Sequence, residues 1–181
     1  MPSDTEGVYY RRDDYASFWR RALVDCVDFV VAAIIGVVLI VVIGAVFNLL
    51  DWMAELIMIV AFAITFGYFV ILKRSRFKTL GYRLGGVSVV GLDGMPPGWG
   101  AMILRAFFIF PGPINWLLDL TWLSSDRHRQ ALRDKVTRTY VIRTGAQPIG
   151  KGRLVYHYYE VCGWNLLVRE VAVEEAKTAV A

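Results

Sequence analysis

Two long apolar runs dominate the first half of the chain. Residues 29–50 contain no charge and one strongly polar side chain, Asn48, and residues 52–72 contain one charge, Glu55. At about 1.5 Å per residue, a helix through the first run is about 33 Å long, close to the thickness of a hydrocarbon core. The pattern therefore predicts two membrane-spanning helices joined as a hairpin.

A third apolar stretch, residues 99–123, is interrupted by charge and by proline. It contains Arg105, Asp119 and a Pro-Gly-Pro sequence at 111–113. Proline removes a backbone donor and clashes with the preceding turn, so we expect two arms, each about half a bilayer long. Basic residues flank both ends, which favours a re-entrant segment that leaves the membrane on the side from which it entered. A kinked third span is the alternative.

Short β-branched segments bounded by turn residues predict strands. Residues 87–91 and 139–143 are expected to pair as a small cytoplasmic sheet. Residues 153–161 and 164–171 have the same character and predict a β extension at the C-terminus.

The fold class predicted from these elements is a mainly α membrane protein. It has two transmembrane helices, a broken third segment, a small cytoplasmic β-sheet and a C-terminal β extension. Ser124 or Ser125 could cap a short basic helix that ends near Val136. The expected domains are an N-terminal surface segment (1–17), a transmembrane domain (18–144) and an aromatic-rich tail (145–181).

Composition and charge agree with a membrane location. Hydrophobic residues make up 56% of the chain and the mean hydropathy is +0.47, a combination that is rare in soluble domains. Basic residues gather in the loop after residue 72, where no acid precedes Asp93. The positive-inside rule places this loop, the Arg20-Arg21 pair and the N-terminus in the cytoplasm.

Acidic and small residues share one face of the first predicted helix. Four of them are spaced three or four positions apart: Asp25, Asp28, Ala32 and Gly36. We expect this face to pack inward against Ala63 and Gly67 of the second helix, because small residues allow helices to approach closely. Arg21 stands four residues before Asp25, which is the spacing of an intrahelical ion pair.

The charged residues near the membrane form the candidate functional site. They are Arg20, Arg21, Asp25, Asp28, Arg105, Asp119 and Asp134. Asp28, at the start of the first apolar run, needs a cation, and Arg105 or Arg20 is the expected partner. One interpretation is a structural network that ties the surface layer to the helices. The other is a proton or cation site at Asp28, assisted by Asp25 and Asp119, since acids inside a membrane commonly mark ion routes.

Other reactive groups form no recognisable site. His128 and His157 have no cysteine or carboxylate at ligand spacing, so we expect no metal and no other cofactor. Ser124 and Ser125 lack His and Asp companions, and there is no phosphate-binding loop, so we do not expect an enzyme. The basic loop suits anionic lipid headgroups better than nucleic acid.

Aromatic residues concentrate in the predicted tail. They include Tyr156, Tyr158, Tyr159 and Trp164. Aromatic side chains are enriched where proteins bind each other, so these residues could contact a partner. They could equally pack on their own small sheet.

Three segments within about residues 15–143 form a pattern when taken in order. Residues 15–21 place an aromatic residue and an arginine pair ahead of Asp28. Residues 79–84 read Thr-Leu-Gly-Tyr-Arg-Leu, and residues 130–134 lead to Thr139 at the end of a closing motif. This pattern resembles the RDD family of small bacterial membrane proteins, in which the loop reads Thr-Pro-Gly-Lys-Arg-Leu. The resemblance makes Arg20 or Arg21, Asp28 and Asp134 the residues for which the family is named.

The resemblance also carries expectations and departures. It implies a protein of the bacterial cytoplasmic membrane, and cation/proton antiport is the activity it suggests. Leu80, Tyr82 and Arg133 stand where the family favours proline, lysine and histidine, and Thr137-Arg138 replaces an Ala-Gly pair. These changes bear on any activity that relied on that histidine or on close backbone approach at that glycine.

The sequence favours a noncatalytic polytopic membrane protein that acts as an accessory or assembly subunit of a larger membrane complex. It offers inward-facing small residues, a charged clamp and an aromatic tail, but no reaction centre. The alternative is a Na⁺ or Li⁺/proton antiporter, or a subunit of one, with Asp28 as the titrating group. The expected partners are membrane lipid and other membrane subunits or further copies of the chain, and no nucleic acid.

Overall fold

The computed structural model consists of two compact units. One is Phe18–Ser88, and the other combines Met1–Ser17 with Val89–Ala181. The structure describes residues 6–47, 51–75, 77–108, 122–123, 126, 128–161 and 164–172.

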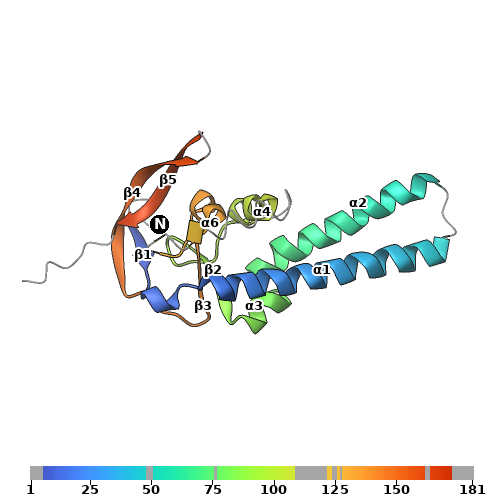
Figure 1. Cartoon of the computed structure of the whole chain (residues 1–181), viewed down its shortest axis with the longest axis horizontal. Coiled ribbons are helices and arrows are strands. Elements are labelled where there is room, and N and C mark those ends of the chain that lie inside the picture. The colour runs from blue at the N-terminus through green and yellow to red at the C-terminus, as the bar shows by residue number, and fades with distance from the viewer. Residues whose placement is uncertain are drawn as a thin grey trace, which may run out of the picture. The chain divides into compact units, whose positions relative to one another are not determined.

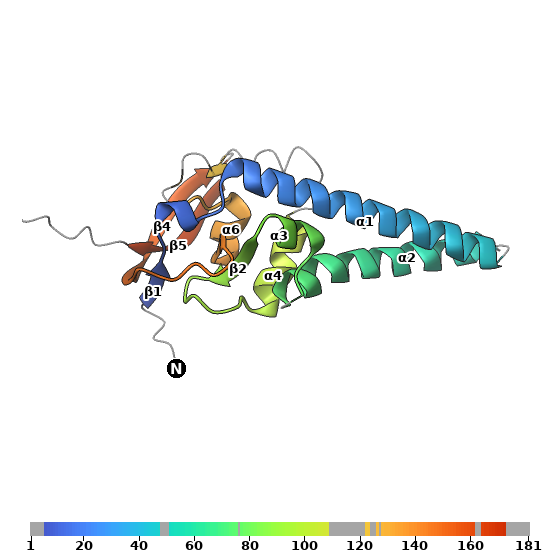
Figure 2. The same cartoon turned by 90° about the horizontal axis from the view of Figure 1, so that it is seen from below.

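The Phe18–Ser88 unit is a helical hairpin. Its helix α1 (Phe18–Phe47) is followed by α2 (Asp51–Gly67), which continues as a π-helical segment, η2 (Tyr68–Leu72), before α3 (Leu80–Leu84). Figures 1 and 2 show α1 and α2 as two arms that open toward α3. Because α1 begins at Phe18, ahead of the apolar run, it carries Asp25 and Asp28 in its first three turns.

Both arms of the hairpin turn apolar side chains outward. The segments Phe18–Val42 and Glu55–Leu72 are long and apolar enough to cross a membrane, which matches the two predicted spans. Only 22% and 17% of their most apolar windows are buried within the chain, whereas a core helix of a soluble protein is mostly buried. Val41 and Ile59, for example, are 61% and 64% exposed. This surface needs lipid or another protein to cover it.

The second unit contains the larger of two small sheets, with the strand order β1 (Glu6–Tyr9), β4 (Gly150–Val161), β5 (Trp164–Ala172). Both pairings in this sheet are antiparallel. A two-stranded sheet pairs β2 (Val87–Gly91) with β3 (Thr139–Arg143), and β2 lies where the chain passes from one unit to the other. All four predicted strands are therefore confirmed, with β4 starting at Gly150.

The N-terminal segment, which the sequence assigned to the surface, contributes a strand and two buried tyrosines. Residues Glu6–Tyr9 form β1, a short 3-10 turn follows at Arg12–Asp14, and Tyr10 and Tyr15 are buried. Their rings meet edge to face at 6.0 Å, within a core that also contains Tyr140. The segment is too short and polar to predict as a strand by itself, and it forms one by pairing with β4.

The predicted basic helix starts later than expected. Helix α6 (Leu132–Thr137) has Ala131 as its N-cap residue, and the described residues 128–131 before it are not helical. The cap comes from inside the helix, because the Asp134 carboxylate accepts a hydrogen bond from the Ala131 N–H at 3.1 Å. A cap at Ser124 or Ser125 is therefore wrong for α6, and both serines lie outside the described residues.

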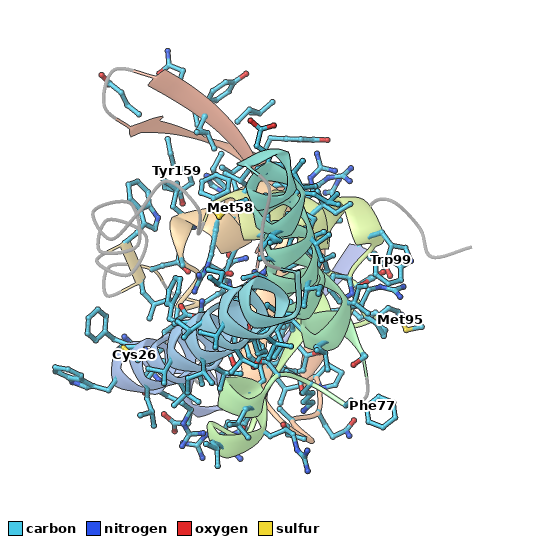
Figure 3. The ribbon with its side chains drawn as sticks, turned by 90° about the vertical axis from the view of Figure 1, so that its right-hand side faces the viewer. Cys26, Met58, Phe77, Met95, Trp99 and Tyr159 are labelled. Carbon is cyan, nitrogen blue, oxygen red and sulfur yellow. The ribbon has the colours of Figure 1, made fainter. Side chains whose placement is uncertain are left out.

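Of the third apolar stretch, the structure describes the first arm and the last two residues, Trp122 and Leu123. Helix α4 (Trp99–Phe107) buries Met102, Arg105 and Ala106 and leaves Trp99 and Phe107 half exposed. Figure 3 shows Met95 and Trp99 projecting from the edge of this unit. The Pro-Gly-Pro break, Asp119 and the choice between a re-entrant and a spanning segment lie outside the described residues.

Candidate functional site

Asp28 on α1 is fully buried and bound on every side by its own unit. Its Oδ2 accepts a hydrogen bond from Thr79 Oγ1 at 2.7 Å, and its Oδ1 accepts from the Gly81 N–H at 2.8 Å. The Tyr68 hydroxyl donates to Oδ1 at 3.3 Å. These donors come from η2 and from the loop into α3, so one carboxylate joins the start of α1 to the end of the hairpin.

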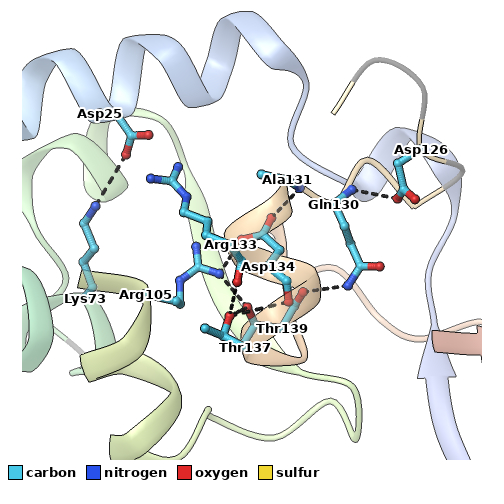
Figure 4. A network of polar contacts seen from close by, with 10 residues as sticks. All are labelled: Asp25, Lys73, Arg105, Asp126, Gln130, Ala131, Arg133, Asp134, Thr137 and Thr139. Atoms are coloured by element: carbon cyan, nitrogen blue, oxygen red, sulfur yellow. Dashed lines mark hydrogen bonds and ion pairs between the residues drawn. The ribbon is translucent and has the colours of Figure 1, made fainter. Parts of the chain in front are cut away.

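Lys73 supplies the positive charge. Its Nζ lies 3.2 Å from Asp28 Oδ2 and 3.5 Å from Asp25 Oδ1, and Figure 4 shows the second contact. The ammonium group also lies over the rings of Phe69 and Tyr82, 5.0 Å and 4.7 Å from their centroids. Burying a carboxylate is costly unless it is paired and hydrogen-bonded, and both conditions hold here.

Two glycines, Gly81 within α3 and Gly85 at its C-cap, allow α3 to lie against α1. A Cβ at Gly81 would stand 2.6 Å from Asp28 Oδ1 and would collide with the backbone oxygen of Val24. A Cβ at Gly85 would collide with the Val24 side chain. Thr79 completes the loop as the N-cap of α3, where its side chain accepts a hydrogen bond from the Tyr82 N–H.

The predicted partner of Asp28 was wrong. The expectation was Arg105 or Arg20, but the cation beside Asp28 is Lys73, and Arg105 forms its ion pair with Asp134. Lys73 was counted only as part of the basic loop, although its place directly after the apolar run was the available signal. Of the arginine pair, Arg21 is buried and Arg20 is partly exposed.

The expected contact of small residues is only partly present. Ala32 is buried, but a Cβ at Gly36 would meet nothing within 4 Å, and Ala63 is exposed. At Gly67 the nearest contact of a Cβ would be Ile71 of the same chain segment. The arms open toward α3, so these positions do not bring α1 and α2 together.

Asp134 is the centre of a second buried cluster, in the other unit. Arg105 of α4 donates to the Asp134 carboxylate and to the Thr139 hydroxyl at the start of β3, as Figure 4 shows. Asp134 and Thr139 are at most 1% exposed, and Arg105 is 4% exposed. The cluster therefore joins α4, α6 and β3, and Asp134 serves at once as ion-pair partner and helix cap.

Glutamine and threonine side chains extend this cluster. The Thr137 and Thr139 hydroxyls lie 3.0 Å apart, and Thr137 also donates to the Arg133 carbonyl. Gln130 Nε2 donates to the Thr139 carbonyl at 2.9 Å, while its own N–H donates to Asp126 at 2.9 Å. All three residues belong to the closing motif or to its departures from the family pattern, but the sequence did not predict their contacts with one another.

Lys135 was also missed as a buried charge. It is 1% exposed and forms ion pairs with Asp126 and with Glu170 of β5. Burial lowers the pKa of its ammonium group, but hydrogen bonds to the two carboxylates outweigh burial and leave the pKa raised. The Lys135 ammonium also lies 4.6 Å from the centre of the Tyr159 ring.

His128 belongs to the aromatic core. Its Nδ1 lies 3.1 Å from the Tyr15 hydroxyl, which also accepts a hydrogen bond from the Tyr10 N–H at 3.0 Å. Burial raises the pKa of both the Tyr15 and the Tyr140 hydroxyl groups, because ionisation would place a phenolate among apolar groups.

The tail tyrosines divide between the two alternatives. Tyr159 packs within its unit, with its ring 5.6 Å from that of Trp122. Tyr156 and Tyr158 are 54% and 77% exposed, which leaves a surface for a partner. The side chain of Trp164 lies outside those that the structure describes.

Comparisons with known proteins give one match. The model of the RDD family matches residues 15–138. No curated protein and no solved structure matches the chain. The matched residues include both carboxylate clusters, Asp28 with Lys73 and Asp134 with Arg105.

Proposed function

The chain belongs to the RDD family, and from that premise we propose that it is a noncatalytic accessory or assembly subunit of a larger membrane complex. Family membership and two apolar helices are consistent with a membrane protein. Support for the specific role comes from the exposed apolar surface of the hairpin and from the pairing of the buried charges.

The observation that carries the proposal is the outward surface of α1 and α2. Less than a quarter of either apolar window is buried by the chain itself. Gly36 lies on α1 with open space where a side chain would stand, so another helix could approach the α1 backbone there. Membrane helices associate through such small residues, which favours a partner subunit at this position.

The buried charges support a structural role. Asp28 has no exposed surface and is bound by Lys73, Thr79, Gly81 and Tyr68. Arg105 and Asp134 are likewise enclosed and bound to each other. Charged groups that are already paired and shielded from water stabilise the contacts between elements, whereas a reacting group must be accessible to its substrate.

The proposal is tested by gentle extraction of the complex from native membranes, followed by native electrophoresis and mass spectrometry. We expect this chain to run in a native band of higher mass than the chain alone, together with partner proteins in stoichiometric amounts. Gly36→Leu should release the partner without unfolding the chain, because the added side chain meets nothing within it. Ala63→Leu, at an exposed position of α2, is the matched control. A band that contains only this chain would overturn the accessory role.

A second candidate, a Na⁺ or Li⁺/proton antiporter or a subunit of one, is favoured by one observation. Two carboxylates, Asp25 and Asp28, lie within 3.5 Å of the same ammonium group, that of Lys73. A proton or a metal cation that displaced Lys73 would find two carboxylates already in place. Proton-linked Na⁺ or Li⁺ flux in proteoliposomes tests this function. Flux that Asp28→Asn leaves unchanged, with Glu55→Gln as control, would remove the site.

We propose the bacterial cytoplasmic membrane as the location, with the N-terminus in the cytoplasm. The support is the run of basic residues after the second span, which includes Lys73, Arg74 and Arg76. In a Cys26→Ser variant, Cys162 reports the side of the C-terminal strands. An impermeant thiol reagent applied to intact spheroplasts should miss Cys162, although denatured protein is labelled. Labelling in intact spheroplasts would place the strands outside.

A further inference from the structure

A cavity of about 250 Å³ opens in the unit that contains the sheets. Its wall combines β1, the loop after β2, the start of α4, the end of α6 and β5. The side chains that carry charge around it are Glu6, Asp93, Arg138 and Arg169. Strands β1 and β5 lie outside the residues that match the family, so this cavity is completed by segments that the family match does not include.

Arg169 brings a buried hydrogen-bond donor to the cavity. Its Nε has no hydrogen-bond partner among the described residues. The guanidinium carbon lies 5.2 Å from the centre of the Tyr156 ring on β4, so the ring holds the group in place. A buried guanidinium nitrogen without an acceptor is unfavourable, and an anionic ligand would supply the acceptor.

Arg138 reaches the same cavity from a strained backbone. It follows α6 with φ 56° and ψ 49°, in the left-handed region that side chains other than glycine, asparagine and aspartate rarely adopt. Its backbone is fixed on both sides, since its N–H donates to Lys135 O and its carbonyl accepts from Leu92 N–H. Helices commonly end on a residue in this conformation, and it is usually glycine, so Arg138 places a guanidinium where most helix ends carry no side chain.

Two carboxylates, those of Glu6 and Asp93, balance the two positive charges around the cavity. Asp93 is exposed, and its Oδ1 accepts the Met95 N–H at 2.9 Å. Glu6 Oε2 lies 3.9 Å from Lys151 Nζ, and both side chains are more than half exposed, so this ion pair is weak. Two guanidinium groups and two carboxylates around one small cavity suit a ligand that carries both signs of charge.

We propose that this cavity binds a small zwitterion that carries a phosphate and an ammonium group, with the phosphate at Arg138 and Arg169 and the ammonium at Glu6 and Asp93. Arginine binds phosphate through paired hydrogen bonds, and carboxylates bind ammonium groups. Phosphoethanolamine has this chemistry, either as the headgroup of a membrane lipid or as a soluble ester. This binding function is separate from the accessory role and does not depend on it.

The test is calorimetric titration of the purified full-length protein in detergent with glycerophosphoethanolamine. We expect saturable binding that Arg169→Gln weakens about 10-fold or more, as for loss of a charge-assisted hydrogen bond. Arg138→Gly should weaken binding similarly while keeping or raising the unfolding temperature, because glycine accepts a positive φ without strain. Arg143→Gln, at an exposed position of β3, is the matched control and should bind as the wild type does.

Two comparisons complete the test. Glycerophosphoglycerol lacks the ammonium group and should bind more weakly, and equal binding would overturn the zwitterion assignment. No binding, or equal binding by wild type, Arg169→Gln and Arg138→Gly, would overturn the site. Native mass spectrometry separates the sources. Phosphatidylethanolamine retained by the wild type and lost from Arg169→Gln identifies the lipid headgroup, and binding of the soluble ester without retained lipid identifies the free compound.

Discussion

At the scale of single residues, two buried tyrosines of the same core differ in how the fold treats their hydroxyl groups. The Tyr15 hydroxyl has partners in the Tyr10 N–H and in His128 Nδ1. The Tyr140 hydroxyl is buried and has no hydrogen-bond partner among the described residues. A buried hydroxyl without a hydrogen bond offsets part of the stability that burial of its ring provides. A hydrogen-bonded hydroxyl adds to stability.

Phenylalanine substitutions should therefore have opposite effects at the two positions. Tyr15→Phe should lower the free energy of unfolding by about 1–2 kcal/mol, because it removes the hydroxyl that accepts a hydrogen bond from the buried Tyr10 N–H. Tyr140→Phe should leave it unchanged or raise it by up to about 1 kcal/mol. The measurement is the unfolding temperature of purified protein in detergent, where about 1 kcal/mol corresponds to roughly 2–4 °C. Equal losses at both positions would contradict this account of the core.

The tyrosine core should also make the protein sensitive to alkali. Burial raises the pKa of the Tyr10, Tyr15, Tyr140 and Tyr159 hydroxyl groups. A raised pKa in the folded state contributes stability that is fully present below the unfolded value, about 10, and is lost as pH rises beyond it. The unfolding temperature should therefore fall steeply above about pH 10. The unfolding temperature of a Tyr140→Phe variant should fall less steeply with pH than that of the wild type. An identical slope would argue against the burial of Tyr140.

At the scale of elements, the close approach of α3 to α1 depends on the missing side chain of Gly81. Gly81→Ala should destabilise the hairpin by about 1–3 kcal/mol, the usual cost of overpacking, because the new methyl group displaces Asp28 or the Val24 backbone. Gly36→Ala is the matched control in the same unit, since it adds a methyl group into open space inside a helix. It should be neutral or stabilising by up to about 1 kcal/mol. Thermal unfolding in detergent distinguishes the two, and equal behaviour would contradict the close approach.

The junction of α4, α6 and β3 depends on a buried ion pair. Arg105→Met should cost about 3–5 kcal/mol, because it removes one partner of a buried ion pair. Adding Asp134→Asn should recover part of that loss, because the amide oxygen can still cap Ala131 and no charge remains buried. Unfolding temperatures of the single and double variants measure the coupling. Additive losses would mean that the pair does not act as a unit.

The sequence predicted elements better than it predicted partners. Hydrophobic runs and β-branched segments identified both hairpin arms and all four strands of the prediction, because period and composition are local properties. Strand β1 was missed because its stability comes from pairing with β4, more than 100 positions away. The partner of Asp28 was missed for a similar reason. Charge counting could not rank Lys73 above Arg20, whereas the fold places Lys73 between two aromatic rings beside the carboxylates.

At the scale of the whole molecule, the chain consists of a hairpin with an apolar exterior and a unit with an aromatic core. Each unit contains one buried acid of the family pattern, Asp28 or Asp134, and each acid ties elements that are distant in the sequence. The sequence identified both acids. Their cations within each unit, Lys73 beside Asp28 and Arg105 beside Asp134, required coordinates because hydrogen-bond geometry has no signature in spacing.

The hairpin exterior makes the last prediction specific to a membrane setting. Val41 is 61% exposed on α1, so a lysine there causes no clash within the chain. In water the change would be neutral. Val41 lies near the middle of the apolar run 29–50. In a bilayer, a charge at the centre of a membrane span costs about 2.5–3.5 kcal/mol, so Val41→Lys should reduce the fraction of protein that stays in the membrane pellet after alkaline carbonate washing. Val41→Leu should match the wild type. If the lysine variant remains fully membrane-bound, a partner protein or a water-filled surface covers this face of α1 instead of lipid, which would strengthen the accessory proposal at the expense of a lipid-exposed hairpin.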